Sequence, residues 1–342
     1  MRTDSGTPGT TSGTTSTMMR AIVHDTYGEA DVLRLERIER PTIGNDEVLV
    51  RVQAAGVDQG VWHMMAGLPY PIRLAGYGFR APKTRVRGRE LAGRVEAVGS
   101  GVTTLRPGDE VFGIGEGTFA EYAPAAAGKL ARKPVGTTFR QAAALPISGL
   151  TALQAVRDHG RVQPGQRVLV IGAAGGVGSY AVQIAKAFGA EVTGVASTGK
   201  VDLVRSLGAD HVIDYRLDDD LAAGERRYDV ILDTGGNRPL RTLRRALTPT
   251  GTLVIVGAET GGRWLGGTDR QLRAVALSPF TSQRLGSFLA SENAADLVAL
   301  AELVESGAVT PAVDRTFPMA AAADALRALE GGHARGKLVL TV

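Results

Sequence analysis

The stretch "VLVIGAAGGVGSYAVQIAKAFGAEVTGVASTGKVDLVRSLGADHVIDY", residues 168–215, decides the fold. A run of Val, Leu and Ile leads into a cluster of glycines, and an amphipathic segment follows through Phe188. A buried strand that turns through glycines into a helix is the first unit of a nucleotide-binding fold. The same alternation of strand and helix recurs as far as "GTLVIVGA" (251–258). It predicts a parallel sheet covered by helices on both faces.

The glycine cluster "GAAGGVG" (172–178) suits an anionic ligand. Gly175 and Gly176 allow a close approach that a Cβ would block, and Gly178 lets the helix pack tightly on the strand. The free N–H groups and the positive dipole end of that helix favour a pyrophosphate. Alanine replaces the first glycine of the strict GxGxxG spacing, but the preceding strand and the following helix are the confirming context. We therefore predict a dinucleotide site that includes Ala174, Gly175, Gly176, Val177 and Gly178.

The end of the second strand, "EVTGVASTGK" (191–200), bears on the choice of dinucleotide. A cofactor with a free ribose 2′-OH is usually held there by Asp or Glu, about 20 residues past the glycines. This chain has Ala196 and Ser197 at that place, then Lys200, with Tyr215 after the third strand. Hydroxyls and a cation suit a 2′-phosphate, so Ser197, Lys200 and Tyr215 predict NADPH rather than NADH. Alternatively, Ser197 caps a helix and Lys200 is an ordinary solvated residue.

The rest of the chain divides around this unit. The segment from Met19 to about Ala143 contains short strand patterns separated by turn residues, such as "EVLVRVQAAGV" (47–57) and "DEVFGIG" (109–115), which indicate a compact β domain. The first 18 residues are rich in Gly, Ser and Thr. We predict a disordered tail at 1–18, a β-barrel domain at 19–143, a dinucleotide-binding domain at 144–286, and a return of the chain to the first domain at 287–342.

Composition excludes several classes of function. The net charge is +4, but basic and acidic residues are interleaved, which does not favour nucleic-acid binding. The chain contains no cysteine, so disulfides, a thiolate nucleophile and sulfur-ligated zinc are excluded. No apolar run reaches membrane-spanning length, so we expect a cytoplasmic protein without a membrane partner.

Several motifs, taken in order, carry a family resemblance: "AAGVDQGVWHMMAG" (54–67), "RGRELAGRVEAVGSGVTTLRPGDEVFG" (87–113), the glycine turn and "GGHARGKLVLTV" (331–342). With them the chain resembles the medium-chain dehydrogenase/reductase superfamily, in its zinc-lacking, quinone oxidoreductase-like branch. The resemblance implies an α/β fold with a Rossmann-type doubly wound parallel sheet and a GroES-like β-barrel catalytic domain, with the nicotinamide between them. It also implies cofactor contacts from Thr151, Gly236, Val256, Gly257, Ala258, Ser278, Phe280, His333, Ala334 and Arg335.

The same resemblance bears on assembly. The stretch "RAVALSPF" (273–280) resembles the edge strand through which Rossmann domains of this family pair. We therefore expect a homodimer.

Departures from the family bear on metal and substrate. Zinc-dependent relatives have a Cys near "GVDQG" and a His before the Glu of "GRE", whereas this chain has no Cys and has Arg89 before Glu90. A guanidinium cannot ligate zinc, so we predict no metal. Quinone reductases of the family usually have Asn and Pro where this chain has Asp58 and Gln59. The substrate therefore stays open.

Without a metal, a carbonyl substrate has no Lewis acid. Quinones and α,β-unsaturated carbonyls then become the easier acceptors, because they delocalise the incoming electrons. Asp58, His63 and Tyr70 are the candidates for supplying the proton that follows, with solvent as the alternative source. We predict a zinc-independent NADPH oxidoreductase acting on such a small molecule. The alternatives are a trans-acting enoyl reductase or an NAD(P)-dependent alcohol dehydrogenase-like enzyme, and a non-catalytic NADPH-binding protein.

Overall fold

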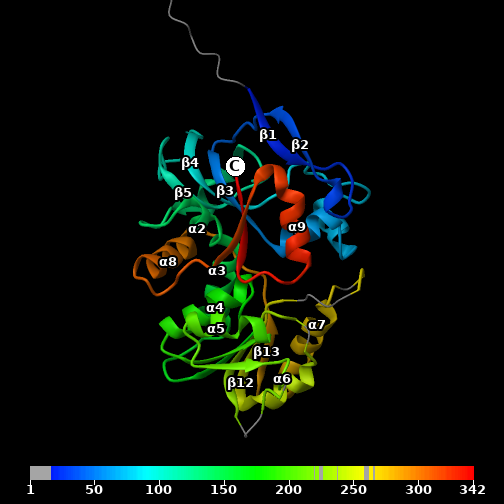
Figure 1. The fold of residues 1–342 in the computed structure, drawn as a ribbon, viewed down its shortest axis with the longest axis vertical. Coiled ribbons are helices and arrows are strands. Elements are labelled where there is room, and N and C mark those ends of the chain that lie inside the picture. The colour runs from blue at the N-terminus through cyan, green and yellow to red at the C-terminus, as the bar shows by residue number, and fades with distance from the viewer. Residues whose placement is uncertain (1–16, 219, 223–225, 237, 258–261, 265) are drawn as a thin grey trace, which may run out of the picture.

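The computed structural model describes residues 17–218, 220–222, 226–236, 238–257, 262–264 and 266–342. Two lobes are stacked along the long axis of the molecule (Figure 1). One contains a seven-stranded, mostly antiparallel sheet, and the other contains a six-stranded sheet. Residues 1–16 of the predicted tail lie outside the described residues, and Met18 already begins strand β1 (Met18–Val23).

The six-stranded sheet is parallel throughout, in the order β10-β9-β8-β11-β12-β13. The chain starts at the central strand β8, runs outward to β9 and β10, and then crosses to β11, β12 and β13 on the other side. This reversal is the doubly wound topology, so the predicted fold class is confirmed for this lobe. Its strands are β8 (Arg167–Ile171), β9 (Glu191–Ala196), β10 (His211–Asp214), β11 (Tyr228–Asp233), β12 (Leu247–Ile255) and β13 (Arg284–Ser287).

Helices cover both faces of this sheet, as the continuous apolar strands predict. Along β8, Val168 and Val170 join the core that α3 and α4 close, whereas Leu169 and Ile171 join the core that α6 and α7 close. This alternation follows from the two-residue period of a strand. The helices are α2 (Phe139–Ala143), α3 (Pro146–Gln154), α4 (Gly176–Ala187), α5 (Val201–Ser206), α6 (Leu240–Ala246) and α7 (Thr268–Leu277). Among the described residues no helix combines the length and apolarity needed to cross a membrane.

The other lobe combines both ends of the chain. Its sheet runs β14-β15-β3-β4-β5-β7, with β6 also paired to β3. The last strand, β15, pairs antiparallel with β3, so the red C-terminal strand lies among the blue and cyan strands (Figure 1). The strands of this sheet are β3 (Glu47–Val57), β4 (Glu90–Val98), β5 (Glu110–Ile114), β6 (Tyr122–Ala126), β7 (Leu130–Arg132), β14 (Val313–Pro318) and β15 (Lys337–Thr341). Strands β1 and β2 (Arg34–Glu39) form a separate two-stranded antiparallel sheet.

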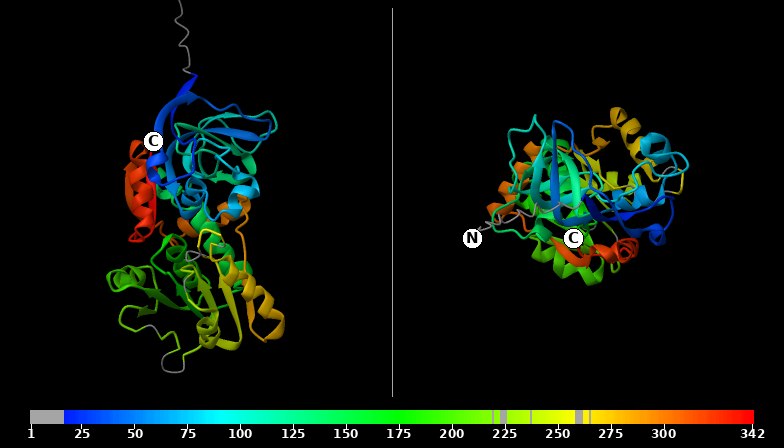
Figure 2. Two further views of the ribbon diagram at one scale, coloured as in Figure 1. Left: turned by 90° about the vertical axis from the view of Figure 1, so that its right-hand side faces the viewer. Right: turned by 90° about the horizontal axis from the view of Figure 1, so that it is seen from above.

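Three helices complete this arrangement: α1 (Gln59–Ala66), α8 (Ala294–Glu305) and α9 (Ala322–Glu330). Helix α9 packs against the flank of the antiparallel lobe, where the side view of Figure 2 shows it in red. Helix α8 packs on α3, because Leu300 lies where a Cβ on Gly149 would stand. Helix α8 follows the parallel sheet in the chain, and it therefore bridges the junction between the lobes.

One expected strand is a helix. The stretch 273–280, predicted as the edge strand, forms the end of α7 and a short 3-10 helix, Ser278–Phe280. Only Ala274 of α7 is fully buried, while Val275 is exposed, so the segment buries a single helical face. Alanine and leucine also favour helix over strand. The edge strand of the parallel sheet is β13.

Candidate nucleotide and hydride-transfer site

The glycine-rich turn leaves backbone donors open. Helix α4 starts at Gly176, and its N-cap, Gly175, has no side chain that could cap it. Ser179 is the first residue of this helix whose N–H finds a backbone acceptor, the Gly175 carbonyl at 3.0 Å. The preceding N–H groups have no acceptor within the helix. Together with the positive end of the helix dipole, they are suited to bind an anion. These donors belong to Gly176, Val177 and Gly178.

Packing explains why glycines occupy this turn. A Cβ on Gly178 would lie 2.1 Å from the Gly172 carbonyl oxygen, so the helix approaches the strand more closely than any other residue allows. A Cβ on Gly175 would meet only that same oxygen, at 3.3 Å, which leaves its outer side open. Ala174 is buried in the core behind the turn. The open side of the turn is therefore the side that can take a ligand.

The predicted 2′-phosphate residues lie together. Ser197 precedes a 3-10 helix (Thr198–Lys200) but makes no capping hydrogen bond in the part of the chain described, which removes the main support for the capping alternative. The backbone N–H of Tyr215 donates to the Ala196 carbonyl at 3.1 Å, which places Tyr215 beside Ser197. A polar surface therefore follows the ends of β9 and β10.

Lys200 joins this surface to the C-terminal loop. Its Nζ donates to the carbonyl oxygens of Gly332 at 3.2 Å and Ala334 at 2.8 Å. Partial burial lowers the pKa of Lys200, Asp314 opposes that shift, and the nearby Arg335 adds to it. The structure thus brings Lys200 to the predicted loop residues His333, Ala334 and Arg335, with two cations in electrostatic reach of each other.

A buried ion pair fixes the loops after β11 and β12. The Arg270 guanidinium from α7 donates to the buried Asp233 carboxylate at 2.5 Å and to the Gly257 carbonyl at 3.3 Å. The same carboxylate accepts from the Gly236 N–H at 3.0 Å. The loop glycines Gly236 and Gly257 are therefore held by Asp233 and Arg270, two residues that the sequence analysis did not select. The only sequence signal was a charged residue at the end of the apolar strand "YDVILD".

Ser278 and Phe280 do not reach the glycine-rich turn. They precede β13, whereas the turn follows β8, and parallel strands place these two positions at opposite edges of the sheet. The Ser278 hydroxyl accepts from the Leu285 N–H at 3.0 Å, and the Phe280 side chain is 85% exposed. The structure therefore places both residues away from the glycine-rich turn. Leu289 follows β13, so it lies at the same edge of the sheet as the glycine-rich turn, and its side chain is exposed.

The other predicted contacts have mixed outcomes. The Thr151 hydroxyl donates to the Ile147 carbonyl at 2.7 Å inside α3, so its hydrogen is already used. The Val256 N–H donates to the Asp233 carbonyl at 2.9 Å, at the same edge as the turn. Ala258 lies outside the described residues.

Two candidate proton residues lie on α1. Asp58 is its N-cap, and its Oδ1 accepts from the Val61 N–H at 3.0 Å, while Oδ2 is buried without a hydrogen-bond partner in the described ranges. His63 Nδ1 lies 2.8 Å from the Leu68 carbonyl. Because a carbonyl only accepts, Nδ1 carries the hydrogen, and Nε2 of the neutral ring is an acceptor. Burial lowers the pKa of His63, which favours this neutral form.

Tyr70 lies where the two lobes touch. Its backbone N–H donates to the Arg263 carbonyl at 2.7 Å, and its ring meets Trp264 edge-on with 5.2 Å between ring centroids. Arg263 and Trp264 belong to the segment between β12 and α7. No hydrogen bond engages the Tyr70 hydroxyl within the described residues. That hydroxyl is therefore available to a substrate at the junction.

A second buried ion pair, which the sequence analysis missed, connects these parts. Lys337 Nζ donates to Glu90 Oε2, with the side chains 2% and 0% exposed, and Glu90 Oε1 accepts from the Ile147 N–H at 2.8 Å. A Cβ on Gly176 would lie 3.3 Å from Lys337 Cδ. Burial raises the pKa of Glu90 to about 7, Lys337 opposes the shift, and the charge of Asp58 adds to it. The pair therefore contacts the starts of both α3 and α4.

The donor set does not fit zinc. Arg89 occupies the place of the family's histidine ligand, and its guanidinium pairs with Glu292 at 2.7 Å. Within the described ranges, no group of three or more His, Asp or Glu residues is arranged to hold a metal ion. No step of the reaction is therefore assigned to a metal.

Known proteins share this architecture. The family described as "Alcohol dehydrogenase GroES-like domain" matches residues 44–135, and the one described as "Zinc-binding dehydrogenase" matches residues 207–340. The mitochondrial NAD(P)H oxidoreductase RTN4IP1 of Mus musculus is 33% identical over 97% of this chain and 91% of its own. The chloroplastic NADPH-dependent alkenal/one oxidoreductase of Arabidopsis thaliana is 36% identical, over 94% and 79% respectively. The structure of the quinone oxidoreductase from Coxiella burnetii superposes with a TM-score of 0.83, at 30% identity over 95% of this chain and 99% of that one.

Fold and site together define an oxidoreductase that uses a nicotinamide cofactor, built from a GroES-like domain and a Rossmann-type domain. The chain belongs to the medium-chain dehydrogenase/reductase family, in its zinc-lacking, quinone oxidoreductase-like branch. The predicted family, fold class and enzyme class are confirmed.

Proposed function

We propose that this enzyme transfers hydride from NADPH to a quinone or an α,β-unsaturated carbonyl without zinc. The Glu90–Lys337 pair is the observation that carries the proposal. Lys337 packs beside Gly176, where α4 begins, and Glu90 lies within electrostatic reach of Asp58. The Glu90–Lys337 pair therefore connects the glycine-rich turn with Asp58, one of the candidate proton residues. The relatives named for quinones and alkenals or alkenones support this substrate class.

The choice of NADPH rests on the residues after β9. The end of this strand carries no Asp or Glu for a ribose 2′-OH, whereas Ser197 and Lys200 follow it and Arg335 lies within electrostatic reach of Lys200. Two cations and a hydroxyl match the charge and hydrogen-bonding capacity of a 2′-phosphate. The open N–H groups at the start of α4 would hold the pyrophosphate. The NADPH dependence in the name of the Arabidopsis relative supports the same choice.

When bound, NADPH supplies the hydride, which the electron-poor carbon of the acceptor receives. The acceptor becomes an enolate or a hydroquinone anion and needs one proton. The Tyr70 hydroxyl donates that proton, because it is unengaged in the described part of the chain, and water then reprotonates the phenolate. His63 Nε2 in the neutral ring can accept a hydrogen bond from a bound molecule, and so can Asp58 Oδ2, which has no partner among the described residues. These two residues orient donors rather than supply the proton.

The test is NADPH consumption with four substrate classes: quinones, enones, enoyl thioesters and aldehydes. Fastest turnover of a quinone or an enone is expected. A preference for enoyl thioesters would replace the proposal with a trans-acting enoyl reductase, and a preference for aldehydes would replace it with an alcohol dehydrogenase-like enzyme. Tight NADPH binding without turnover of any class would make the protein a non-catalytic NADPH-binding protein.

Assembly and location complete the proposal. Strand β13 lies at the edge of the parallel sheet, and an exposed edge can pair with a second copy. The homodimer therefore forms through β13 rather than through residues 273–280. A cytoplasmic location remains a prediction.

A further inference from the structure

Two charges act on the buried carboxylate of Glu90: the Lys337 ammonium and the Asp58 carboxylate. Glu90 begins β4, Lys337 begins β15, and Asp58 is the N-cap of α1. Lys337 Nζ donates to Glu90 Oε2, and both side chains of this pair are buried. Asp58 is only 9% exposed, so water screens its charge poorly. This region therefore has more negative than positive charge when both acids are ionised.

Two neutral groups from helices also contact or approach Glu90. The Ile147 N–H, at the start of α3, donates to Glu90 Oε1 at 2.8 Å. The phenol of Tyr180, on α4, is buried, and both its burial and the charge of Glu90 raise its pKa, so it stays neutral. Lys337 and Asp58 are therefore the charged groups that govern the protonation of Glu90.

The same lysine packs against the start of α4. A Cβ on Gly176 would lie 3.3 Å from Lys337 Cδ. The Gly176 N–H is one of the open donors of the glycine-rich turn, where the proposed function places the pyrophosphate of the cofactor. A pyrophosphate at this helix start attracts the Lys337 ammonium and repels the Glu90 carboxylate. A negative charge nearby favours the neutral form of a carboxylic acid.

We propose that dinucleotide binding is coupled to the uptake of a proton by Glu90. The inference rests on the nucleotide site of the proposed function, and it does not depend on the acceptor substrate. The proton comes from solvent, and the Lys337 ammonium then balances the charge of the pyrophosphate rather than that of Glu90. Burial already raises the pKa of Glu90 to about 7 without nucleotide, so a modest further rise changes its charge near neutral pH.

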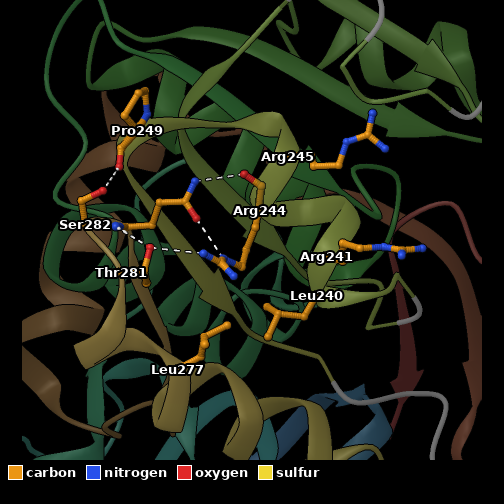
Figure 3. Close-up of a pocket in the computed structure, with 9 residues that line it drawn as sticks. Leu240, Arg241, Arg244, Arg245, Pro249, Leu277, Thr281 and Ser282 are labelled. Carbon is orange, nitrogen blue, oxygen red and sulfur yellow. Dashed lines mark hydrogen bonds between the residues drawn. The ribbon is translucent and has the colours of Figure 1, made fainter.

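A cavity of about 510 Å³ on the same lobe provides a contrasting set of charges (Figure 3). It is lined by α6 and by the segment before β13, so it lies at the opposite edge of the parallel sheet from the glycine-rich turn. Figure 3 shows Arg241 and Arg245 directed away from the Arg244 guanidinium, so the three side chains do not converge on one anion. Replacing Arg241 and Arg245 therefore changes the charge of this lobe at a place remote from Glu90.

Calorimetric titration of NADPH into the intact protein, in buffers with different enthalpies of ionisation, counts the protons taken up per nucleotide. If the pKa of Glu90 rises from about 7 by roughly one unit, the uptake should be about 0.5 proton at pH 7.5 and about 0.1 at pH 9. The test variant is E90Q/K337M, which removes both charges of the pair and keeps an acceptor for the Ile147 N–H. At pH 7.5 it should take up about 0.5 proton fewer than wild type.

Two control variants should retain the wild-type proton count. K186M/D210N removes a partly exposed ion pair of matched composition, and R241Q/R245Q removes two exposed cations of α6. A loss of proton uptake in either control equal to that in E90Q/K337M would overturn the proposal, because uptake would then follow the overall charge. Circular dichroism checks that all three variants are folded.

Two further outcomes would overturn the coupling and leave the proposed function intact. One is NADPH binding with the same proton count in wild type and E90Q/K337M. The other is a wild-type proton count that does not fall between pH 7.5 and pH 9, a comparison that needs no variant. Failure of the wild type to bind NADPH at all would instead overturn both the coupling and the proposed cofactor.

Discussion

Replacing Lys337 with methionine removes the cation that pairs with the buried carboxylate of Glu90, at the centre of the proposed site. Glu90 would keep its hydrogen bond from the Ile147 N–H but lose its cation, while methionine fills most of the space of the lysine stem. Breaking a buried ion pair by removing one partner costs about 3–5 kcal/mol, because the remaining charge is uncompensated. We expect a loss of that size in the free energy of unfolding at pH 8, where Glu90 of the wild type is ionised.

The loss in the free energy of unfolding caused by K337M should be smaller at low pH. Burial raises the pKa of Glu90 to about 7, above its value of 4.5 in an unfolded chain. Folding is therefore favoured by this group at low pH, and that contribution falls away as the pH rises from about 4.5 to 7. The difference between these two pKa values corresponds to about 3 kcal/mol, at 1.36 kcal/mol per pKa unit. At pH 5 Glu90 is protonated in both proteins, so K337M should lose only about 1 kcal/mol, the value of one hydrogen bond.

Urea unfolding of the cofactor-free wild type and K337M at pH 5 and pH 8 measures the loss in the free energy of unfolding at each pH. The double variant E90Q/K337M removes both charges and keeps an acceptor for the Ile147 N–H. It should recover most of the stability that K337M loses at pH 8, because replacing a buried pair by neutral groups is often nearly neutral. An equal loss by K337M at both pH values would refute the reasoning. So would a double variant no more stable than K337M at pH 8.

Four further predictions concern the proposed function. K200A should weaken NADPH binding by about 1–3 kcal/mol and leave NADH nearly unchanged, as followed by cofactor fluorescence; an equal loss for both would mean that Lys200 only orders the C-terminal loop. Y70F should lower kcat for an enone by about 10²-fold, and an unchanged kcat would assign the proton to solvent. Metal analysis should find no stoichiometric zinc, and activity should survive a chelator; one tightly bound zinc per chain would contradict the donor chemistry. Sedimentation at micromolar concentration should give the mass of a dimer, and a strict monomer would exclude pairing through β13.

The parallel lobe was largely predictable, because its signals are local. A strand buried on both faces needs a continuous apolar run, and the turn after it needs glycine where a Cβ would meet the Gly172 carbonyl at 2.1 Å. Both requirements appear directly in residues 168–178. The prediction of an edge strand at residues 273–280 was wrong, because a short apolar stretch fits a strand as well as one face of a helix. Burial of Ala274 alone among its neighbours distinguishes the two, and burial is a property of the folded chain.

The candidate site was predictable only in part, for a related reason. The donors of the turn lie on one continuous segment, so the sequence shows them together. Arg270 and Asp233 are far apart in the chain, and so are Lys337 and Glu90. Their pairing depends on strand order, which sequence patterns do not give. Each of these charges does leave a weak signal: Glu90 and Lys337 begin apolar strands, Asp233 ends one, and Arg270 lies on a helix that follows one.

The two buried pairs have a common physical role. Burying a charge is costly, and its partner repays that cost only if the geometry is fixed. Arg270 and Asp233 fix the loops after β11 and β12, and Lys337 and Glu90 fix the starts of α3 and α4. All four elements end or begin at the edge of the sheet where the nucleotide turn lies. Hydride transfer demands close and constant spacing between donor and acceptor carbons, and loops alone are too mobile to maintain it. We therefore expect the buried charges to hold the backbone around the proposed reaction, so a change in their protonation should alter stability as well as turnover.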